Sequence, residues 1–363
     1  MAKRSLASIW GQALRRNATA LGRQALRAGN RAIVQAVKQA AQKATKQAAK
    51  QATKQVLKQA VKQVVQRAKP ARPPVSGPGT WVPGLALGPA GARRYRLYRP
   101  AGVAAGERLP LLVMLHGCGQ DADRLAASTR MNRVAERERF LVLYPEQDRL
   151  ANPQGCWNWF DTRGGRAQRE AASVLGAIDQ VCAAHPADRQ RVAVAGLSAG
   201  ASLVALLATL SPGRFCAVVM HSGVAPGSAD SPMSALAAMR GRRSGRHLAA
   251  PRDPATPPWP PLLVIQGTAD AVVAPANATA AVQAWAAAAG AQPAAPRTVQ
   301  RGQRYPMVIT DFKVGRQVVA TQVLIDSLGH AWSGGAAGQP FSDPRGPDAS
   351  RLLWAFVARH LRD

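Results

Sequence analysis

The segment Gly196-Leu197-Ser198-Ala199-Gly200 holds a serine whose surroundings are typical of a nucleophile. This G-x-S-x-G pattern follows a predicted strand over residues 192–195 and precedes a predicted helix over residues 199–210. A tight turn between the two needs glycine, because larger side chains would strike the neighbouring strand or helix. The turn lifts the serine hydroxyl into the open at the start of the helix. We therefore predict that Ser198 is a catalytic nucleophile; the alternative is a Gly/Ser turn that only starts a helix.

A serine hydroxyl is a weak nucleophile and needs a general base. Four histidines follow Ser198, and three of them are poorly placed. His221 ends a predicted strand too soon after the serine, His247 lies in an arginine-rich segment, and His360 lies on the last predicted helix. His330 lies in a glycine-flanked loop after a predicted strand, so we predict that His330 is the base rather than an ordinary loop histidine.

The acid that orients the histidine must be an aspartate, because no glutamate follows Glu170. Asp270 comes three residues after Gly267, which directly follows a predicted strand over residues 262–266. Catalytic groups of parallel sheets lie at the carboxyl ends of strands. Asp326 is the competitor, only four residues from His330. We predict that Asp270 orients the imidazole and stabilises its protonated form.

An acyl-transfer site also needs backbone N–H groups that bind the oxyanion. One donor is expected from Ala199, directly after the nucleophile. The other is expected from the loop that follows an apolar strand over residues 111–115, and Cys118 is the predicted donor there.

The segments that position these residues alternate between strand-like and helix-like patterns. Strands are predicted over residues 95–98, 111–115, 140–144, 192–195, 216–221 and 262–266, and a hairpin over 306–328. Helices are predicted over residues 126–139, 169–184, 199–210, 275–289 and 350–361, and an insertion over 225–260. This alternation predicts an α/β fold with a mostly parallel sheet that is covered on both faces.

The first fifth of the chain has a different composition. Of the net charge of +29, most comes from residues 1–72, which hold 17 Lys and Arg and no acidic residue. We therefore predict two parts: residues 1–75, a basic Ala/Lys/Gln-rich extension that is helical or disordered, and residues 76–363, the catalytic domain. Residues 70–90 contain six prolines and are predicted to be a stiff linker. The extension is expected to contact an anionic surface, a granule or nucleic acid; the alternative is a solvated tail.

Several classes of site and location lack support in the sequence. The sequence contains no run of 18 apolar residues, so no membrane-spanning helix is expected. It contains no CxxC pair, so the cysteine spacing does not support a zinc site. Residues 6–14 are apolar but broken by Ser8, Gly11 and Gln12, so a standard signal peptide is not expected.

Six short segments together resemble the poly(3-hydroxybutyrate) depolymerase family of esterases. They are HGCGQ (116–120), CWNWF (156–160), GLSAG (196–200), GTAD (267–270), GHAWSGG (329–335) and PDAS (347–350). The resemblance implies an α/β-hydrolase fold and ester hydrolysis by a Ser198–Asp270–His330 triad without metal or cofactor. It favours a secreted protein, while the lack of a clear signal leaves a cytoplasmic location open.

The family resemblance leaves the substrate open. It favours hydroxyalkanoate esters or oligomers, and the alternative is a feruloyl or acetylxylan-type esterase, to which the family is related. A binding protein whose basic extension is the functional part is a third hypothesis. If the protein is exported, a Cys118–Cys156 disulfide is expected, and two packed thiols are the alternative. The residues expected to line the substrate pocket are His116, Gln120, Trp157, Trp159 and Trp332, although Trp157 and Trp159 could instead be core residues.

Overall fold

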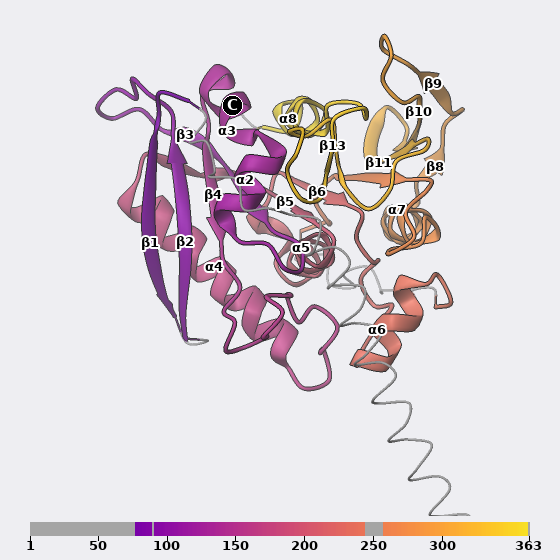
Figure 1. Cartoon of the computed structure of the whole chain (residues 1–363), viewed down its shortest axis with the longest axis horizontal. Helices are drawn as coiled ribbons and strands as arrows, with labels where there is room; N and C mark the ends of the chain where they lie inside the picture. Colours follow the sequence, from indigo (N-terminus) through magenta and orange to yellow (C-terminus); the bar gives the residue numbers. More distant parts are fainter. Residues whose placement is uncertain (1–76, 89–90, 244–256, 362–363) are drawn as a thin grey trace, which may run out of the picture. The chain divides into compact units, whose positions relative to one another are not determined.

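Apolar runs of the sequence form one large sheet in the computed structural model of the chain (Figure 1). The structure describes residues 77–88, 91–243 and 257–361, all within one unit, Ala60–Asp363. The basic extension predicted over residues 1–75 lies outside the described residues. The strand order is β1-β2-β4-β3-β5-β6-β7-β11-β10-β8, and β9 pairs with β10.

The centre of the sheet is parallel, as the alternation of strands and helices predicts. The parallel strands are β3 (Leu109–Leu115), β4 (Leu141–Pro145), β5 (Ala187–Leu197), β6 (Ala217–His221), β7 (Leu262–Gly267) and β11 (Gln317–Ile325). Antiparallel strands flank them: β1 (Thr80–Gly88) and β2 (Gly91–Arg99) on one side, and β8 (Gln292–Pro293), β9 (Arg297–Val299) and β10 (Met307–Val314) on the other.

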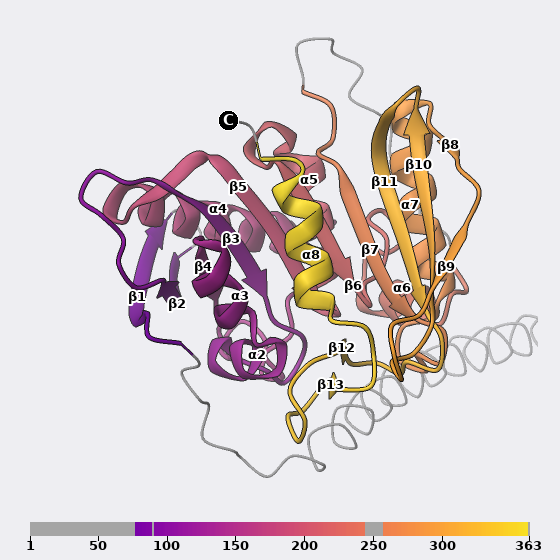
Figure 2. The same ribbon diagram turned by 90° about the horizontal axis from the view of Figure 1, so that it is seen from above.

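Two hydrophobic cores lie on the two faces of the sheet, because successive side chains of a strand point to opposite faces. In β3, for example, Leu111, Val113 and Leu115 belong to one core, while Leu112 and Met114 belong to the other. The first core is closed by α4 (Arg166–Ala184), α5 (Ala199–Leu210) and α7 (Ala276–Ala289). The second is closed by α2 (Ala122–Thr129), α3 (Met131–Glu138) and α8 (Ala349–Ala358). Figure 2 shows α8 lying across one face of the sheet, with α4 and α5 behind it.

The prediction of a linker over residues 70–90 is wrong for its second half. Residues Thr80–Gly88 form β1, which pairs with β2 along its whole length. The proline content suggested a linker, but β1 is an edge strand, and an edge strand tolerates a proline such as Pro83 because one row of its hydrogen-bonding groups is unused. The indole Nε1 of Trp81 donates to Asp123 Oδ1 at 2.9 Å and ties the strand to α2.

The prediction of a single helix over residues 126–139 is also wrong. The chain forms α2 and α3, which are separated by Arg130 in the left-handed conformation, with φ of 52°. The Arg130 guanidinium donates to the carbonyl oxygen of Gly334 at 2.6 Å, 204 residues along the chain. A contact of this sequence separation is not visible in a local pattern, so the break could not be predicted.

Two further segments complete the described chain. The insertion predicted over residues 225–260 contains α6 (Pro232–Met239), and its residues 244–256 lie outside the described part. The loop after β11 forms two short paired strands, β12 (Trp332–Ser333) and β13 (Ser342–Asp343). Within the described residues, no helix is long and apolar enough to cross a membrane.

Candidate active site

Ser198 lies at a sharp turn between the end of β5 and the start of α5. Its φ of 55° is unusual for a residue other than glycine, and this strained conformation is typical of a nucleophile in this motif. A Cβ atom on Gly196 would strike the backbone of Gly200 and Ala201. A Cβ atom on Gly200 would strike the backbone of Leu115, the last residue of β3. Close packing of the turn therefore requires both glycines.

His330 and Asp270 meet Ser198 from two other strand ends. His330 follows β11, and its Nε2 lies 2.9 Å from Ser198 Oγ. Its Nδ1 lies 2.8 Å from Asp270 Oδ2, and Asp270 follows β7. Because an ionised carboxylate only accepts hydrogen bonds, Nδ1 carries the proton and Nε2 accepts the hydrogen bond from the serine hydroxyl. The side chain of His330 is 9% exposed and that of Asp270 is fully buried.

The carboxylate of Asp270 is held in its ionised form. Burial alone would raise its pKa, but the hydrogen bond and charge of His330 and the amides of Val272 and Val273 outweigh burial, so the pKa lies below its ordinary value. The two amides donate to Oδ1 at 2.9 and 2.8 Å. A buried anion with fixed donors keeps the imidazole in one orientation.

Sequence reasoning missed Gln266 as a partner of this carboxylate. Its Nε2 donates to Asp270 Oδ2 at 2.9 Å and to the carbonyl oxygen of Val273 at 3.0 Å. Gln266 is buried in β7, and a polar residue within the apolar run LLVIQ was the available signal.

The loop after β3 lies against the serine, as expected for an oxyanion-binding loop. A Cβ atom placed on Gly117 would lie 3.4 Å from Ser198 Cβ. The amides of Gly117, Gly119 and Gln120 are taken by Gln120 Oε1, Gln154 O and Gly117 O respectively. Within the described part of the chain, no acceptor takes the amide of Cys118 or that of Ala199 at the first position of α5. These are the two amides predicted to bind the oxyanion.

Four of the five expected pocket residues lie inside the protein, which differs from the prediction. His116, Gln120, Trp157 and Trp332 are each at most 3% exposed. They support the loops: Trp157 Nε1 donates to the His116 carbonyl oxygen at 3.0 Å, and Trp332 Nε1 donates to Ser350 Oγ at 3.1 Å. A motif identifies an aromatic residue but not the direction in which its side chain points.

Trp159 is the fifth expected pocket residue, and it is only partly buried. It packs edge-to-face against Phe160, with ring centroids 5.7 Å apart. Both rings pack on an apolar cluster that includes Val273, three residues after Asp270. The pair therefore lies near the loop that carries Asp270.

The histidine and the aspartate that were considered but not predicted as base and acid, His221 and Asp326, make other contacts in the structure. His221 is buried at the end of β6, where its Nε2 accepts from the amide of Ser333 at 3.2 Å and its ring stacks on Trp332. It thereby supports the loop that carries His330. Asp326 is exposed, and its carboxylate accepts from Thr268 Oγ1 at 3.2 Å.

A disulfide joins Cys118 of the loop after β3 to Cys156 of the CWNWF segment, 38 residues apart. Closing a loop of this length restricts the unfolded chain. We expect reduction to lower the free energy of unfolding by roughly 2–4 kcal/mol. Urea unfolding with and without reductant measures this difference. The double variant Cys118→Ala/Cys156→Ala should be insensitive to reductant, and a wild-type chain that is equally insensitive would contradict the prediction.

Two buried histidines make stability depend on pH. Burial lowers the pKa of His116 to about 4, and burial with the nearby His330 charge lowers that of His221 to about 3. In the unfolded chain both have a pKa of about 6.5, so below that pH the unfolded state binds more protons. The free energy of unfolding should therefore fall from about pH 6.5 towards pH 4, by on the order of 1.4 kcal/mol per pH unit for each histidine.

Urea unfolding at a series of pH values checks this expectation. The variant His221→Gln should lose one histidine's share of the slope over the same pH range. An unchanged slope would mean that His221 is not held neutral.

The described residues are similar to solved esterase structures. An acetyl xylan esterase from Aspergillus awamori superposes with a TM-score of 0.56 at 18% identity, covering 77% of this chain and 100% of that one. At this identity the similarity shows the fold, which is the α/β-hydrolase fold that the sequence predicted.

Curated relatives are similar over parts of their length. Poly(3-hydroxyalkanoate) depolymerase C of Paucimonas lemoignei is 34% identical over 203 residues, which are 51% of this chain and 45% of that one. Feruloyl esterase B of Neurospora crassa is 31% identical over 119 residues, which are 32% of this chain and 39% of that one. The chain thus spans less than half the length of these two relatives.

The family model described as esterase PHB depolymerase matches residues 93–298, which include β3 to β8, the serine turn and Asp270. His330 lies beyond the matched range. Since the match covers more than half of the 363 residues, the chain belongs to the esterase PHB depolymerase family.

Proposed function

We propose that this protein hydrolyses carboxylic esters through an acyl-enzyme formed on Ser198. The observation that carries the proposal is the chain of hydrogen bonds from Ser198 Oγ to His330 Nε2 and from His330 Nδ1 to Asp270 Oδ2. A serine, a base and an orienting acid in this order are the parts that nucleophilic acyl transfer requires.

In the proposed reaction, Ser198 Oγ attacks the ester carbonyl carbon while its proton moves to His330 Nε2. Asp270 stabilises the imidazolium that forms. The negative charge that develops on the carbonyl oxygen is stabilised by the amides of Cys118 and Ala199, which have no acceptor within the described part of the chain. The proton on Nε2 then passes to the leaving alcohol, and a water activated by His330 hydrolyses the acyl-enzyme.

The proposed substrates are esters or oligomers of hydroxyalkanoates. Family membership supports this class, as does the similarity to a depolymerase whose name specifies poly(3-hydroxyalkanoate). The partly exposed aromatic pair Trp159 and Phe160 near the Asp270 loop gives an apolar surface for an alkyl chain.

An alternative substrate class is the feruloyl or acetyl esters of plant polysaccharides. Similarity to feruloyl esterase B and to a probable acetylxylan esterase A of Aspergillus clavatus, 25% identical over 221 residues, favours it. Both classes use the same chemistry at Ser198.

The test compares kcat/KM on 3-hydroxybutyrate oligomers with that on methyl ferulate and acetylated xylan, with Ser198→Ala as the blank. We expect the oligomers to be preferred by at least about tenfold, the effect of one or two methylene-sized contacts in a pocket. Preference for methyl ferulate or acetylated xylan would establish the alternative. Hydrolysis of none of them would contradict the proposed function.

A further inference from the structure

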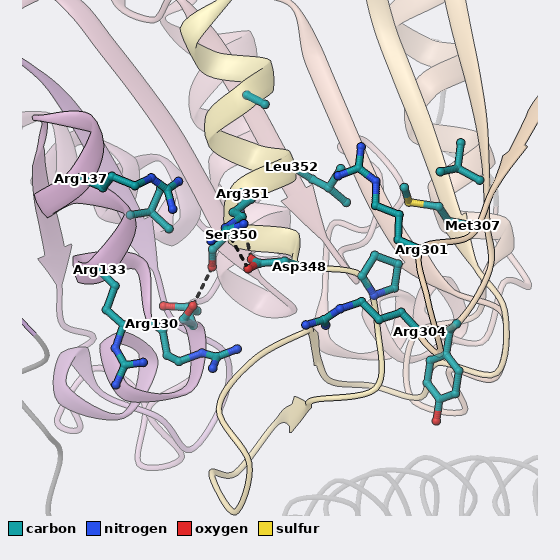
Figure 3. A pocket seen from close by; sticks show the side chains of 16 residues that line it. Arg130, Arg133, Arg137, Arg301, Arg304, Met307, Asp348, Ser350, Arg351 and Leu352 are labelled. Carbon is teal, nitrogen blue, oxygen red and sulfur yellow. Dashed lines mark hydrogen bonds and ion pairs between the residues drawn. The ribbon is translucent and has the colours of Figure 1, made fainter.

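A cavity of about 560 Å³ lies away from the serine turn and is lined by six arginines (Figure 3). It opens between α3, the start of α8 and the segment that joins β9 to β10. The arginines are Arg130, Arg133, Arg137, Arg301, Arg304 and Arg351. Figure 3 shows arginines of the α3 side and of the β9–β10 side on opposite walls of the cavity. Neither Ser198 nor His330 nor Asp270 lines it.

The positive charge of this cavity is not balanced by its own lining. Asp348 is the one acidic residue among the lining residues, and it already pairs with Arg351 at 3.6 Å and caps α8. Arg137 pairs with Glu138 at 2.7 Å. Folding that brings so many cations around one cavity costs free energy unless an anion offsets the charge.

Two of the arginines are available to a ligand. Arg133 on α3 and Arg301 on the opposite wall are exposed. Within the described residues, neither guanidinium group donates a hydrogen bond or pairs with a carboxylate. Arg130 and Arg304 donate to the carbonyl oxygens of Gly334 and Gly346, so they are held in place while their charge stays uncompensated. The cavity thus has two arginines that carbonyl oxygens hold in place and two whose guanidinium groups have no partner among the described residues.

The size and lining of the cavity indicate what kind of anion fits. A volume of this order is that of a small-molecule site rather than of an extended surface. Guanidinium groups bind phosphate oxygens through paired hydrogen bonds, and cations on two walls suit a ligand with several phosphates. Met307 and Leu352 give the cavity an apolar part beside the arginines.

We propose that this arginine-lined cavity binds a small molecule that carries two or more phosphate groups, with Arg133 and Arg301 as its principal contacts. The site is independent of the proposed ester hydrolysis, because it shares no residue with the serine site. Either an inorganic oligophosphate or a nucleotide supplies the required chemistry.

The test measures the modification of individual arginines of the full chain by phenylglyoxal, read by peptide mass spectrometry. Millimolar tripolyphosphate is expected to slow modification of Arg133 and Arg301 by about tenfold, which is the protection that a bound ligand gives at about ten times its Kd. The exposed arginines Arg149 and Arg316 are outside the cavity and should change by less than about twofold. Equal slowing of all four, or no slowing, would overturn the proposal.

Affinity for tripolyphosphate gives a second readout at physiological salt. The variant Arg133→Gln/Arg301→Gln should bind about tenfold more weakly or worse, while the matched Arg149→Gln/Arg316→Gln should bind like the wild type. Because all these chains keep the same basic extension, its contribution cancels in the comparison. Equal weakening of both double variants would contradict a defined site.

Two further probes identify the source of the phosphates. If ATP protects Arg133 and Arg301 better than tripolyphosphate does, the ligand is a nucleotide whose base uses the apolar wall. If tripolyphosphate protects equally well, an inorganic oligophosphate suffices. Protection by duplex DNA but by neither small anion would overturn the proposal in favour of a nucleic-acid surface.

Discussion

Replacing Ser198 by alanine is expected to lower kcat for a short p-nitrophenyl ester by on the order of a million-fold. The hydroxyl is the only group of this residue that contacts His330 Nε2, at 2.9 Å, and alanine has nothing that can form the acyl-enzyme. Residual hydrolysis would come from the oxyanion amides and substrate binding alone. Initial rates of p-nitrophenol release measure the effect.

The matched control for this variant is Ser228→Ala. Ser228 is 1% exposed, and its Oγ has no hydrogen-bond partner among the residues that the structure describes. Its loss should change kcat by less than about twofold, because removing a buried hydroxyl that has no hydrogen-bond partner in the described structure breaks no contact. If Ser198→Ala kept wild-type activity, another residue would have to be the nucleophile.

The second large effect is expected for Asp270→Asn, which should lower kcat by on the order of ten-thousand-fold. The amides of Val272 and Val273 both donate to Oδ1, so the side-chain oxygen of an asparagine would take that position. Its NH2 group would then face His330 Nδ1 and impose the tautomer in which Nε2 carries the proton. That tautomer cannot accept the proton of Ser198.

Asp326→Asn is the matched control for this prediction. Asp326 is the other aspartate considered from the sequence, and its exposed carboxylate contacts only Thr268 in the described structure. It should retain activity within about twofold. A larger loss in Asp326→Asn than in Asp270→Asn would reverse the assignment of the acid.

The central sheet and the serine turn could be predicted because their signals are local. The strand before Ser198, the two glycines and the helix over residues 199–210 lie within one short segment, and the observed α5 begins and ends at the predicted residues. Asp270 and His330 are far apart in sequence, but the carboxyl ends of parallel strands meet at one edge of the sheet, so topology brought them together as candidates.

Features that depend on distant contacts could not be predicted. The helix break at Arg130 involves a hydrogen bond to the carbonyl oxygen of Gly334. The strand β1 forms through its backbone pairing with β2. The burial of Trp157 and Trp332 likewise depends on partners that lie far away in sequence, His116 and Ser350. The proline content suggested a linker, and the motifs of the family resemblance suggested a pocket, but the observed packing differs at both places.

The most direct test of the proposed mechanism is covalent labelling of the wild-type chain with a fluorophosphonate, followed by peptide mass spectrometry. The serine oxygen attacks phosphorus and displaces fluoride, so only an activated hydroxyl reacts rapidly. We predict one label per chain, on Ser198, with loss of esterase activity in proportion to labelling and no label on Ser198→Ala. A label on a different residue, or full labelling that leaves hydrolysis unchanged, would contradict the assignment of Ser198 as the nucleophile.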